Sequence, residues 1–221
     1  MLGIVVPVYN ERENIRLIYN VIHQSAAKYN IDYKLFFIDD GSTDLLTLSI
    51  YDKLDNCVVI KNTHKGQHEA ILTGFRYLQN NCEYVCTIDC DMQDPPEVLF
   101  LMYLKLKSTN ANAICGIRLS REDSFFKIMT AKMYYSLTSI ILKLPVKNSS
   151  DFYILKSDCI PLLDVNNLRL SVWINCNAIG YDYIRGKRVY GKTKYSVPKL
   201  IITALYGLKY TICLKKRLIK R

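Results

Sequence analysis

Five short apolar segments, each followed by a turn and a helical pattern, constrain the fold of this chain more than any other feature. The segments are residues 2–8, 34–38, 57–60, 84–88 and 111–117. Near-continuous apolar runs of this length are typical of strands that are covered on both faces, as in a parallel sheet. Apolar residues in the intervening stretches recur at helical spacing, for example Ile15, Ile18 and Ile22. Strands that alternate with helices in this way predict a doubly wound α/β sheet.

Residues at the ends of the first two segments predict how these strands pass into helices. Pro7 has no N–H for a strand ladder, so we expect the first strand to end or bulge there. Asn10, with Glu13 three residues later, matches the pattern of a capping box. After the second segment, Ser42 or Thr43 is expected to cap the next helix.

The alternation ends after residue 118, and the remaining pattern is less regular. One long helix is predicted over residues 125–143, and Pro145 is expected to end it. A loop and a short strand are predicted over residues 149–155. Residues 171–196 are predicted to be irregular.

The composition excludes several classes of protein. Half of the 221 residues are apolar and 23% are charged, which is typical of a globular domain. The net charge of +10 favours an anionic partner, whether a phosphate ligand, an acidic membrane surface or nucleic acid. There is no zinc-finger spacing and no aromatic-rich RNA-binding pattern, so we expect no nucleic-acid partner. None of the eight cysteines forms C-x-x-C, so we expect mostly buried thiols in a reducing compartment.

Acidic residues follow the fourth segment, at the point where that strand is expected to end. Asp89 and Asp91 are spaced i, i+2, and Asp94 follows them. Buried carboxylates are unfavourable unless something pairs them, and ligands bind at the carboxyl ends of the strands in open α/β sheets. If the strand breaks at Cys90, both carboxylates can bind one Mg²⁺ or Mn²⁺ ion that holds a phosphate group. The alternative is an acidic turn in which Pro95 opens the next helix.

Six motifs, taken together, resemble the family 2 glycosyltransferases, which bind nucleotide sugars with the GT-A fold. The motifs are V-P-V-Y-N-E (6–11), I-D-D-G-S-T-D (38–44), D-C-D-M-Q-D-P-P (89–96), G-I-R (116–118), S-D-F (150–152) and R-V-Y-G-K-T-K-Y (188–195). Within the family they most resemble dolichyl-phosphate mannose synthase and other polyprenyl-phosphate glycosyltransferases. The resemblance implies a GT-A (Rossmann-like), doubly wound, mixed and mainly parallel sheet with a C-terminal amphipathic helix.

The resemblance also implies which residues bind and react. The implied nucleotide-sugar-binding residues are Pro7, Tyr9, Glu11, Asp39, Asp40, Asp89, Cys90, Arg118 and Lys194. The implied ligands of an Mg²⁺ or Mn²⁺ cofactor are Asp89, Asp91 and Gln93. The implied catalytic residues are Asp151, Asp91 and Arg188. Lys132 stands where many relatives have an arginine for the acceptor phosphate.

By this resemblance the chain is expected to be a metal-dependent, inverting glycosyltransferase. It is expected to move a hexose from a nucleotide-diphosphate sugar to a polyprenyl phosphate, either dolichyl or undecaprenyl phosphate. One alternative is transfer to a hydroxyl of a glycan or saccharide-lipid in cell-surface polysaccharide synthesis, and another is an inactive GT-A binding subunit. Asp151 is expected to be the base for a hydroxyl acceptor, but mainly to position groups for a phosphate, which is already an anion.

The C-terminal stretch carries the expectation about location. Residues 197–214 are amphipathic but interrupted by two lysines, so no membrane-spanning helix is predicted. Residues 215–221 add five Lys or Arg, which favour an anionic lipid surface. We therefore expect a catalytic domain over residues 1–196, and a basic tail over 197–221 that lies peripherally on the cytoplasmic face of a membrane. A packed terminal helix with a solvated basic end is the alternative, and homo-oligomer formation stays open.

Overall fold

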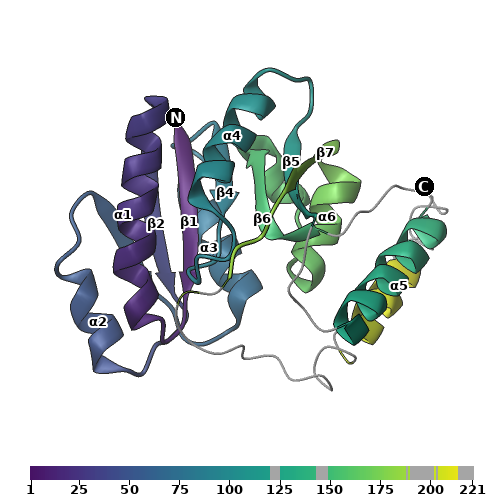
Figure 1. Cartoon of the computed structure of the whole chain (residues 1–221), viewed down its shortest axis with the longest axis horizontal. Helices are drawn as coiled ribbons and strands as arrows, with labels where there is room; N and C mark the ends of the chain where they lie inside the picture. The colour runs from purple at the N-terminus through teal and green to yellow at the C-terminus, as the bar shows by residue number, and fades with distance from the viewer. Residues whose placement is uncertain (120–124, 143–148, 188, 190–201, 203, 214–221) are drawn as a thin grey trace.

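The computed structural model describes residues 1–119, 125–142, 149–187, 189, 202 and 204–213 (Figure 1). Within these residues the chain forms a seven-stranded sheet of order β3-β2-β1-β4-β6-β5-β7. The strands are β1 Leu2–Val8, β2 Tyr33–Asp39, β3 Cys57–Lys61, β4 Tyr84–Thr87, β5 Ala113–Arg118, β6 Ser149–Lys156 and β7 Ala178–Tyr183.

The sheet is mixed and mainly parallel, as predicted. Strand β1 pairs in parallel with β2 and β4, β2 with β3, and β5 with β7. Strand β6 runs the other way, antiparallel to both β4 and β5. The carboxyl ends of β1, β2 and β4 therefore lie together at one edge, and β6 enters the sheet from that edge.

Helices cover both faces of the sheet. The helices are α1 Arg12–Tyr29, α2 Leu45–Tyr51, α3 Gln67–Leu78, α4 Pro96–Lys107, α5 Phe125–Leu142 and α6 Leu168–Asn175, with two 3-10 helices, η1 Ser157–Leu162 and η2 Val165–Asn167. The apolar sides of α1 and α4 pack on one face, and those of α3 and α6 on the other. This arrangement confirms the doubly wound architecture (Figure 1).

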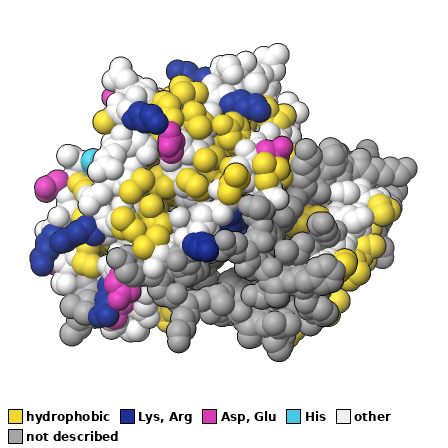
Figure 2. Space-filling view, in the orientation of Figure 1, with side chains coloured by type: hydrophobic (Ala, Val, Ile, Leu, Met, Phe, Trp, Pro, Cys, Tyr) yellow, Lys and Arg dark blue, Asp and Glu magenta, His cyan; other side chains and the backbone are white. Residues whose placement is uncertain are grey.

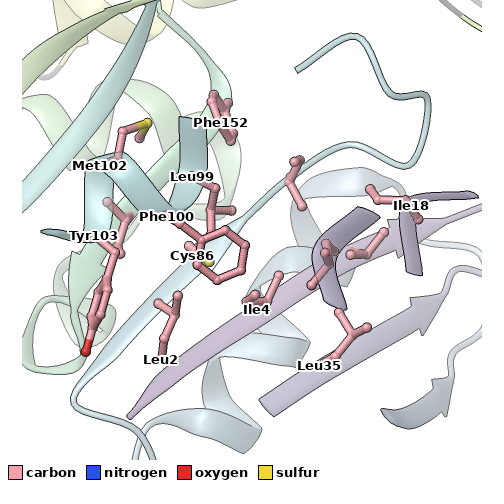
Figure 3. Close-up of a cluster of buried hydrophobic side chains, with 14 of the residues drawn as sticks. Leu2, Ile4, Ile18, Leu35, Cys86, Leu99, Phe100, Met102, Tyr103 and Phe152 are labelled. Atoms are coloured by element: carbon pink, nitrogen blue, oxygen red, sulfur yellow. The ribbon is translucent and has the colours of Figure 1, made fainter. Parts of the chain in front are cut away.

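Alternate residues of the central strand supply both cores. Leu2 and Ile4 of β1 belong to the cluster under α1 and α4, whereas Val5 belongs to the cluster under α3. Figure 3 shows Leu2 and Ile4 with Phe100 of α4 and Ile18 of α1. Burying an aliphatic side chain of this size stabilises the fold by about 1.5–3 kcal/mol. The two clusters therefore fix the strand ends that carry the polar residues.

The first strand does not end at Pro7, contrary to prediction. It continues to Val8, whose carbonyl oxygen accepts a hydrogen bond from Asp40 N. Pro7 and Val5 are two positions apart in β1, so their backbone groups face the same side of the strand. On that side the Val5 carbonyl oxygen faces β4 and accepts from Ile88 N. Pairing between β1 and β4 stops at Val5, so the missing N–H of Pro7 falls where no strand pairs with it.

The predicted caps of α1 and α2 are also wrong. The N-cap of α1 is Glu11 and makes no side-chain capping bond. Asn10 has φ 52° instead, and its Oδ1 accepts from Thr43 N at 2.9 Å, so it ties two loops together. Asp44 caps α2, because its Oδ1 accepts from Thr47 N at 2.6 Å. Local pattern cannot distinguish a helix cap from a contact between two loops.

The predicted irregular region over residues 171–196 is wrong in its first part. Helix α6 covers Leu168–Asn175, and β7 covers Ala178–Tyr183 at the edge of the sheet. Most residues of β7 are only partly buried, so the strand lacks the continuous apolar run that marks the central strands. The predicted long helix is confirmed as α5.

Residues 204–213 are helical and lie beside α5 (Figure 1). This C-terminal helix, as we call residues 204–213, approaches α5 closely at Gly207, where a Cβ atom would lie 2.5 Å from the Tyr134 hydroxyl. Tyr210 of the same helix donates to Asp164 Oδ2 at 2.7 Å. Across the residues that the structure describes, no helix combines the length and apolar character needed to cross a bilayer.

Candidate active site

Polar side chains gather where β1, β2, β4 and β6 approach one edge of the sheet. Asp39 ends β2, and the acidic loop, as we call residues 88–95, follows β4. Asp151 lies near the start of β6. The sequence therefore brings carboxylates from three separate strands to the edge at which open α/β sheets bind ligands.

Asp39, the last residue of β2, and Asp40, the next residue, are both buried and accept hydrogen bonds from neighbouring loops. Asp39 accepts from Ser42 N at 2.7 Å and from the Tyr51 hydroxyl at 2.9 Å. Asp40 accepts from Lys65 N at 2.8 Å and from Gly66 N at 2.9 Å. Burial and the charge of Asp39 raise the pKa of the Tyr51 phenol. Both carboxylates therefore fix the loops that follow β2 and β3.

An aromatic pair lies next to Asp40. The rings of Tyr9 and His64 stack with centroids 4.4 Å apart. His64 Nδ1 lies 2.8 Å from Asp40 Oδ2, which fixes the imidazole. Pro7 precedes the pair and is partly buried, and Glu11 accepts from the Asn14 side chain at 2.8 Å. Three predicted pocket residues, Pro7, Tyr9 and Glu11, thus follow one another where β1 passes into α1.

The acidic loop holds several carboxylates close together. Asp89 Oδ1 accepts from the Gln67 side chain at 2.7 Å, and Asp91 Oδ1 accepts from Gln93 N at 3.0 Å. Burial raises the pKa of the Asp89 carboxyl, and the charges of Asp94, Asp91 and Asp151 raise it further. Cys90, between the two aspartates, is buried. The neighbouring carboxylates therefore disfavour ionisation of Asp89.

Asp94 connects the acidic loop to the ends of strands β5 and β7. Its side chain is completely buried and accepts from the Tyr183 hydroxyl, from Arg118 Nη2 at 3.3 Å and from Arg185 Nε at 3.3 Å. Arg118 Nε also donates to the Tyr183 oxygen at 3.2 Å. Burial lowers the pKa of the Arg118 guanidinium, but the charge of Asp94 and its neighbours outweighs burial and raises it. Arg118, predicted to bind the nucleotide sugar, is here paired with a carboxylate of the chain.

Asp151 lies between two basic side chains. Its Oδ1 is 3.4 Å from Arg169 Nε and 3.7 Å from His68 Nε2. His68 Nδ1 donates to Val165 O at 3.1 Å, so Nε2 is the nitrogen that faces Asp151. Burial alone would raise the pKa of Asp151, but Arg169 and His68 together hold it well below its usual range. Asp151 is therefore ionised at neutral pH.

The carboxylate cluster fits a hard divalent cation by its chemistry. All its side-chain donors are oxygens, which Mg²⁺ and Mn²⁺ prefer, and a cation would offset the repulsion that raises the pKa of Asp89. The part of the chain that the structure describes has no ready-made group of three or more Asp, Glu, His or Cys arranged as a metal site. A ligand set of Asp89, Asp91 and Gln93 therefore needs groups from the substrate or water to complete it.

Three predicted site residues lie outside what the structure describes. Arg188 and Lys194 are not among the described residues. Lys132 lies in α5, but its side chain is outside the description.

Sequence reasoning missed several residues of the site, among them His64, Gln67, His68, Arg169 and Arg185. Gln67, His68, Arg169 and Arg185 each contact a carboxylate that is at least 18 positions away in the chain, so no local spacing indicates the contact. The sequence offers one signal for Gln67 and His68: both are polar and stand directly after Gly66, where the helical pattern that follows residues 57–60 begins.

Comparison with known proteins decides the family. Residues 3–162 match the family model described as Glycosyl transferase family 2. The chain belongs to this family. It is 30% identical over 218 residues to the uncharacterized glycosyltransferase YkcC of Bacillus subtilis, covering 93% of this chain and 67% of YkcC. The predicted family and enzyme class are thereby confirmed, and the chain is a glycosyltransferase.

Two further likenesses describe the relatives of this glycosyltransferase. The undecaprenyl-phosphate 4-deoxy-4-formamido-L-arabinose transferase of Photorhabdus laumondii is 26% identical, over 90% of this chain and 64% of its own length. Mannosyl-3-phosphoglycerate synthase of Rubrobacter xylanophilus superposes with a TM-score of 0.74 at 14% identity, covering all of this chain and 75% of that one. The chain thus spans about two thirds of the length of the relatives matched by sequence.

A third likeness is to a structure solved with ligands. Glucosyl-3-phosphoglycerate synthase of Mycobacterium tuberculosis, in complex with Mn²⁺, UDP and glucosyl-3-phosphoglycerate, has a TM-score of 0.69 at 14% identity. It covers 97% of this chain and 79% of its own. These structural likenesses confirm the GT-A fold.

Proposed function

We propose that this chain catalyses metal-dependent, inverting transfer of a sugar from a nucleotide-diphosphate sugar to a polyprenyl phosphate. The observation that carries the proposal is the position of an ionised Asp151 beside the carboxylate cluster, between two basic side chains. The name of the relative from Photorhabdus laumondii supports an undecaprenyl-phosphate acceptor.

The donor is proposed to bind at the carboxyl ends of β1, β2 and β4. The stacked Tyr9 and His64 offer a flat aromatic surface next to Asp39 and Asp40, which suits a nucleotide base. Asp39 uses both oxygens within the chain, but each carboxylate oxygen has a further lone pair for a base N–H. Lys194 is proposed to add positive charge to the same pocket.

Asp89, Asp91 and Gln93 are proposed to hold Mg²⁺ or Mn²⁺ against the donor diphosphate. The bound ion supplies positive charge that stabilises the departing nucleoside diphosphate. Gln67 orients Asp89 through its amide, and Gln93 N orients Asp91. Arg188 is proposed to contact the same diphosphate.

The charge state of Asp151 favours a phosphate acceptor over a hydroxyl acceptor. A general base works best when its pKa lies near the working pH, and the pKa of Asp151 is held far below that. A hydroxyl must lose a proton as it attacks, whereas a phosphate oxygen is already an anion. Asp151 is therefore proposed to position the acceptor and to balance the charge of Arg169 and His68, and Lys132 to bind the acceptor phosphate.

Replacing Asp151 by asparagine separates the two acceptor classes. We expect Asp151→Asn to lower kcat with polyprenyl phosphate by less than about tenfold, because no proton has to be removed. A general base would lose about 10²–10⁴-fold on removal. The measurement is steady-state kinetics, with Asp158→Asn, an exposed acid beyond the other end of β6, as the control. A loss above a hundredfold on polyprenyl phosphate contradicts the assignment.

The proposed function is tested by a panel of UDP and GDP sugars with Mn²⁺. Each donor is offered to undecaprenyl phosphate, to 3-phosphoglycerate and to a free sugar. We expect transfer of at least one sugar to undecaprenyl phosphate. Transfer to the free sugar alone supports the hydroxyl alternative, and donor binding without any transfer supports the inactive binding subunit.

We propose that α5 and the C-terminal helix rest on the membrane that contains the acceptor. Exposed apolar side chains follow one side of each helix. On α5 they recur every three or four residues, at Met129, Met133, Leu137 and Ile140. On the C-terminal helix they are Leu205, Tyr206 and Ile212, with the preceding Ile202. Figure 2 shows hydrophobic side chains along the outer edge of this helix pair. The proposal places the enzyme peripherally on the cytoplasmic face, with residues 1–196 as catalytic domain and 197–221 as membrane-proximal tail.

Charge substitutions on this surface should weaken membrane binding. We expect Ile140→Glu and Leu205→Glu each to lower partition into anionic vesicles about tenfold, because an apolar side chain no longer enters the interface. Partition should also fall as salt rises, since charges are screened over about 10 Å at 0.1 M. Flotation with phosphatidylglycerol vesicles measures both, with Leu104→Glu on α4 as control. Equal flotation of all three variants and wild type argues against this surface.

A further inference from the structure

We propose that Arg185 and Gly186 are positioning residues for the acidic loop and, through it, for the metal ligands. The inference rests on the proposed function, because it takes Asp91 and Gln93 as ligands of Mg²⁺ or Mn²⁺. Neither the motifs nor the comparisons assign a role to Arg185 or Gly186. Both lie in the clamp segment, as we call residues 184–187, which follows β7 and has no regular secondary structure.

The acidic loop needs contacts from outside to keep its conformation. It is irregular between the end of β4 at Thr87 and the start of α4 at Pro96. Met92, in its middle, has φ 61°, a left-handed conformation that is unfavourable for a residue with a side chain. Such backbone strain persists only where the surrounding structure holds it in place. The contacts that hold this loop therefore decide where its carboxylates lie.

The clamp segment supplies two of these contacts, to consecutive residues of the loop. Gly186 N donates to Gln93 O at 2.7 Å, and Arg185 Nε donates to Asp94 Oδ1 at 3.3 Å. The Asp94 side chain is completely buried and that of Arg185 is only 19% exposed, so water screens their attraction little. The loop is therefore held by residues about 90 positions away in the chain.

Gln93 connects the clamp segment to the metal ligands. Its carbonyl oxygen is held by Gly186, and its N–H donates to Asp91 Oδ1 at 3.0 Å. The backbone that the clamp segment holds is thus the backbone that orients one proposed ligand and carries another. A small divalent ion such as Mg²⁺ demands ligand distances close to about 2.1 Å, so a small shift of this backbone weakens its binding.

Arg185 can be replaced without leaving Asp94 unpaired. The carboxylate keeps Arg118 Nη2 at 3.3 Å and the Tyr183 hydroxyl as partners. Because a cation and a donor remain, no uncompensated buried charge is created. Arg185→Gln should therefore loosen the loop without unfolding the sheet. Arg185→Lys keeps the charge but not the planar fork, and it should loosen the loop less.

Gly186 allows a matched pair of substitutions. Gly186 is exposed, and a Cβ atom there would lie 3.5 Å from Gln93 O and 3.6 Å from Met92 O, which are ordinary contact distances. Alanine therefore fits and keeps the N–H that donates to Gln93. Proline removes that N–H, so Gly186→Ala is the control for Gly186→Pro.

The test measures metal affinity and loop opening separately. Mn²⁺ binding is titrated by EPR with UDP or GDP, whichever binds tighter, and hydrogen exchange of residues 88–95 is followed without metal or nucleotide. We expect the Kd for Mn²⁺ and the exchange rate each to rise about tenfold in Arg185→Gln and about fivefold in Gly186→Pro, because each loses a hydrogen bond. Gly186→Ala, and Arg76→Gln on α3, should stay within about twofold of wild type.

The two readouts separate the failure of each claim. Urea denaturation shows which variants fold, and Arg185→Gln decides alone if Gly186→Pro does not. In folded variants, a change in only one readout, or in neither, overturns the proposal. If wild type binds no Mn²⁺ with either nucleotide, the metal-dependent function is wrong, whereas faster exchange in Arg185→Gln still shows that the clamp segment positions the loop.

Discussion

Asp89→Asn is expected to lower sugar transfer about a thousandfold and to make the metal-free chain more stable at neutral pH. The loss of transfer follows because a metal ligand contributes several kcal/mol to charge stabilisation, and each 1.4 kcal/mol is about tenfold in rate. The gain in stability follows because burial and three neighbouring carboxylates raise the pKa of Asp89. Asparagine can still accept from Gln67 without carrying charge.

The sign of the pH dependence is set by the raised pKa. The folded chain binds the Asp89 proton more tightly than the unfolded chain, so stability falls as pH rises from about 4 through the raised pKa. Urea denaturation of wild type between pH 5 and pH 8 should show this loss, and Mn²⁺ should reverse it. Asp89→Asn should show neither effect, whereas the exposed Asp55→Asn should behave as wild type. Full transfer by Asp89→Asn, or full wild-type activity in excess chelator, contradicts the metal assignment.

Asp94→Ala is expected to be the most destabilising single substitution at the site. It removes the completely buried carboxylate that pairs with Arg118 and Arg185 and accepts from Tyr183. Removing one partner of a buried ion pair leaves an uncompensated charge and destabilises by about 3–5 kcal/mol. Denaturant unfolding measures the loss directly. Asp94→Asn should lose less, because its amide oxygen can still accept from Tyr183.

Glu97→Ala is the matched control for Asp94→Ala. Glu97 lies three positions later and makes a shorter ion pair, with Oε1 2.6 Å from Lys28 Nζ, but its side chain is 48% exposed. Exposed ion pairs contribute little because water solvates both charges. We expect the denaturation midpoint of Glu97→Ala to stay near that of wild type. Equal losses for Glu97→Ala and Asp94→Ala would falsify the account of Asp94 as a buried anchor.

The sequence predicted those parts of the fold that have a local signal. Continuous apolar runs marked β1, β2 and β4, because strands covered on both faces need apolar residues at every position. Strand β7 was missed because it lies at the sheet edge and is only partly buried. The predicted cap of α1 was wrong because the Asn10 side chain accepts a hydrogen bond from a loop more than 30 residues away.

The same reasoning explains which parts of the site were predicted. The spacing of Asp89 and Asp91 at a strand end is a local pattern, and the structure places both in one carboxylate cluster. The pairing of Asp94 with Arg118 and Arg185, and of Asp151 with His68 and Arg169, depends on which strands are neighbours. Strand β6 becomes a neighbour of β4 only by entering the sheet antiparallel, and the sequence does not indicate that order.

The bond formed in the product tests the central claim most directly. Undecaprenyl phosphate is incubated with Mn²⁺ and an α-linked nucleotide sugar that the chain turns over, and the product is examined by ¹H and ³¹P NMR. The account predicts a phosphodiester between the lipid phosphate and the sugar, with the anomeric centre inverted to β. A sugar joined to a hydroxyl oxygen, or a phosphodiester with retained α configuration, would contradict it.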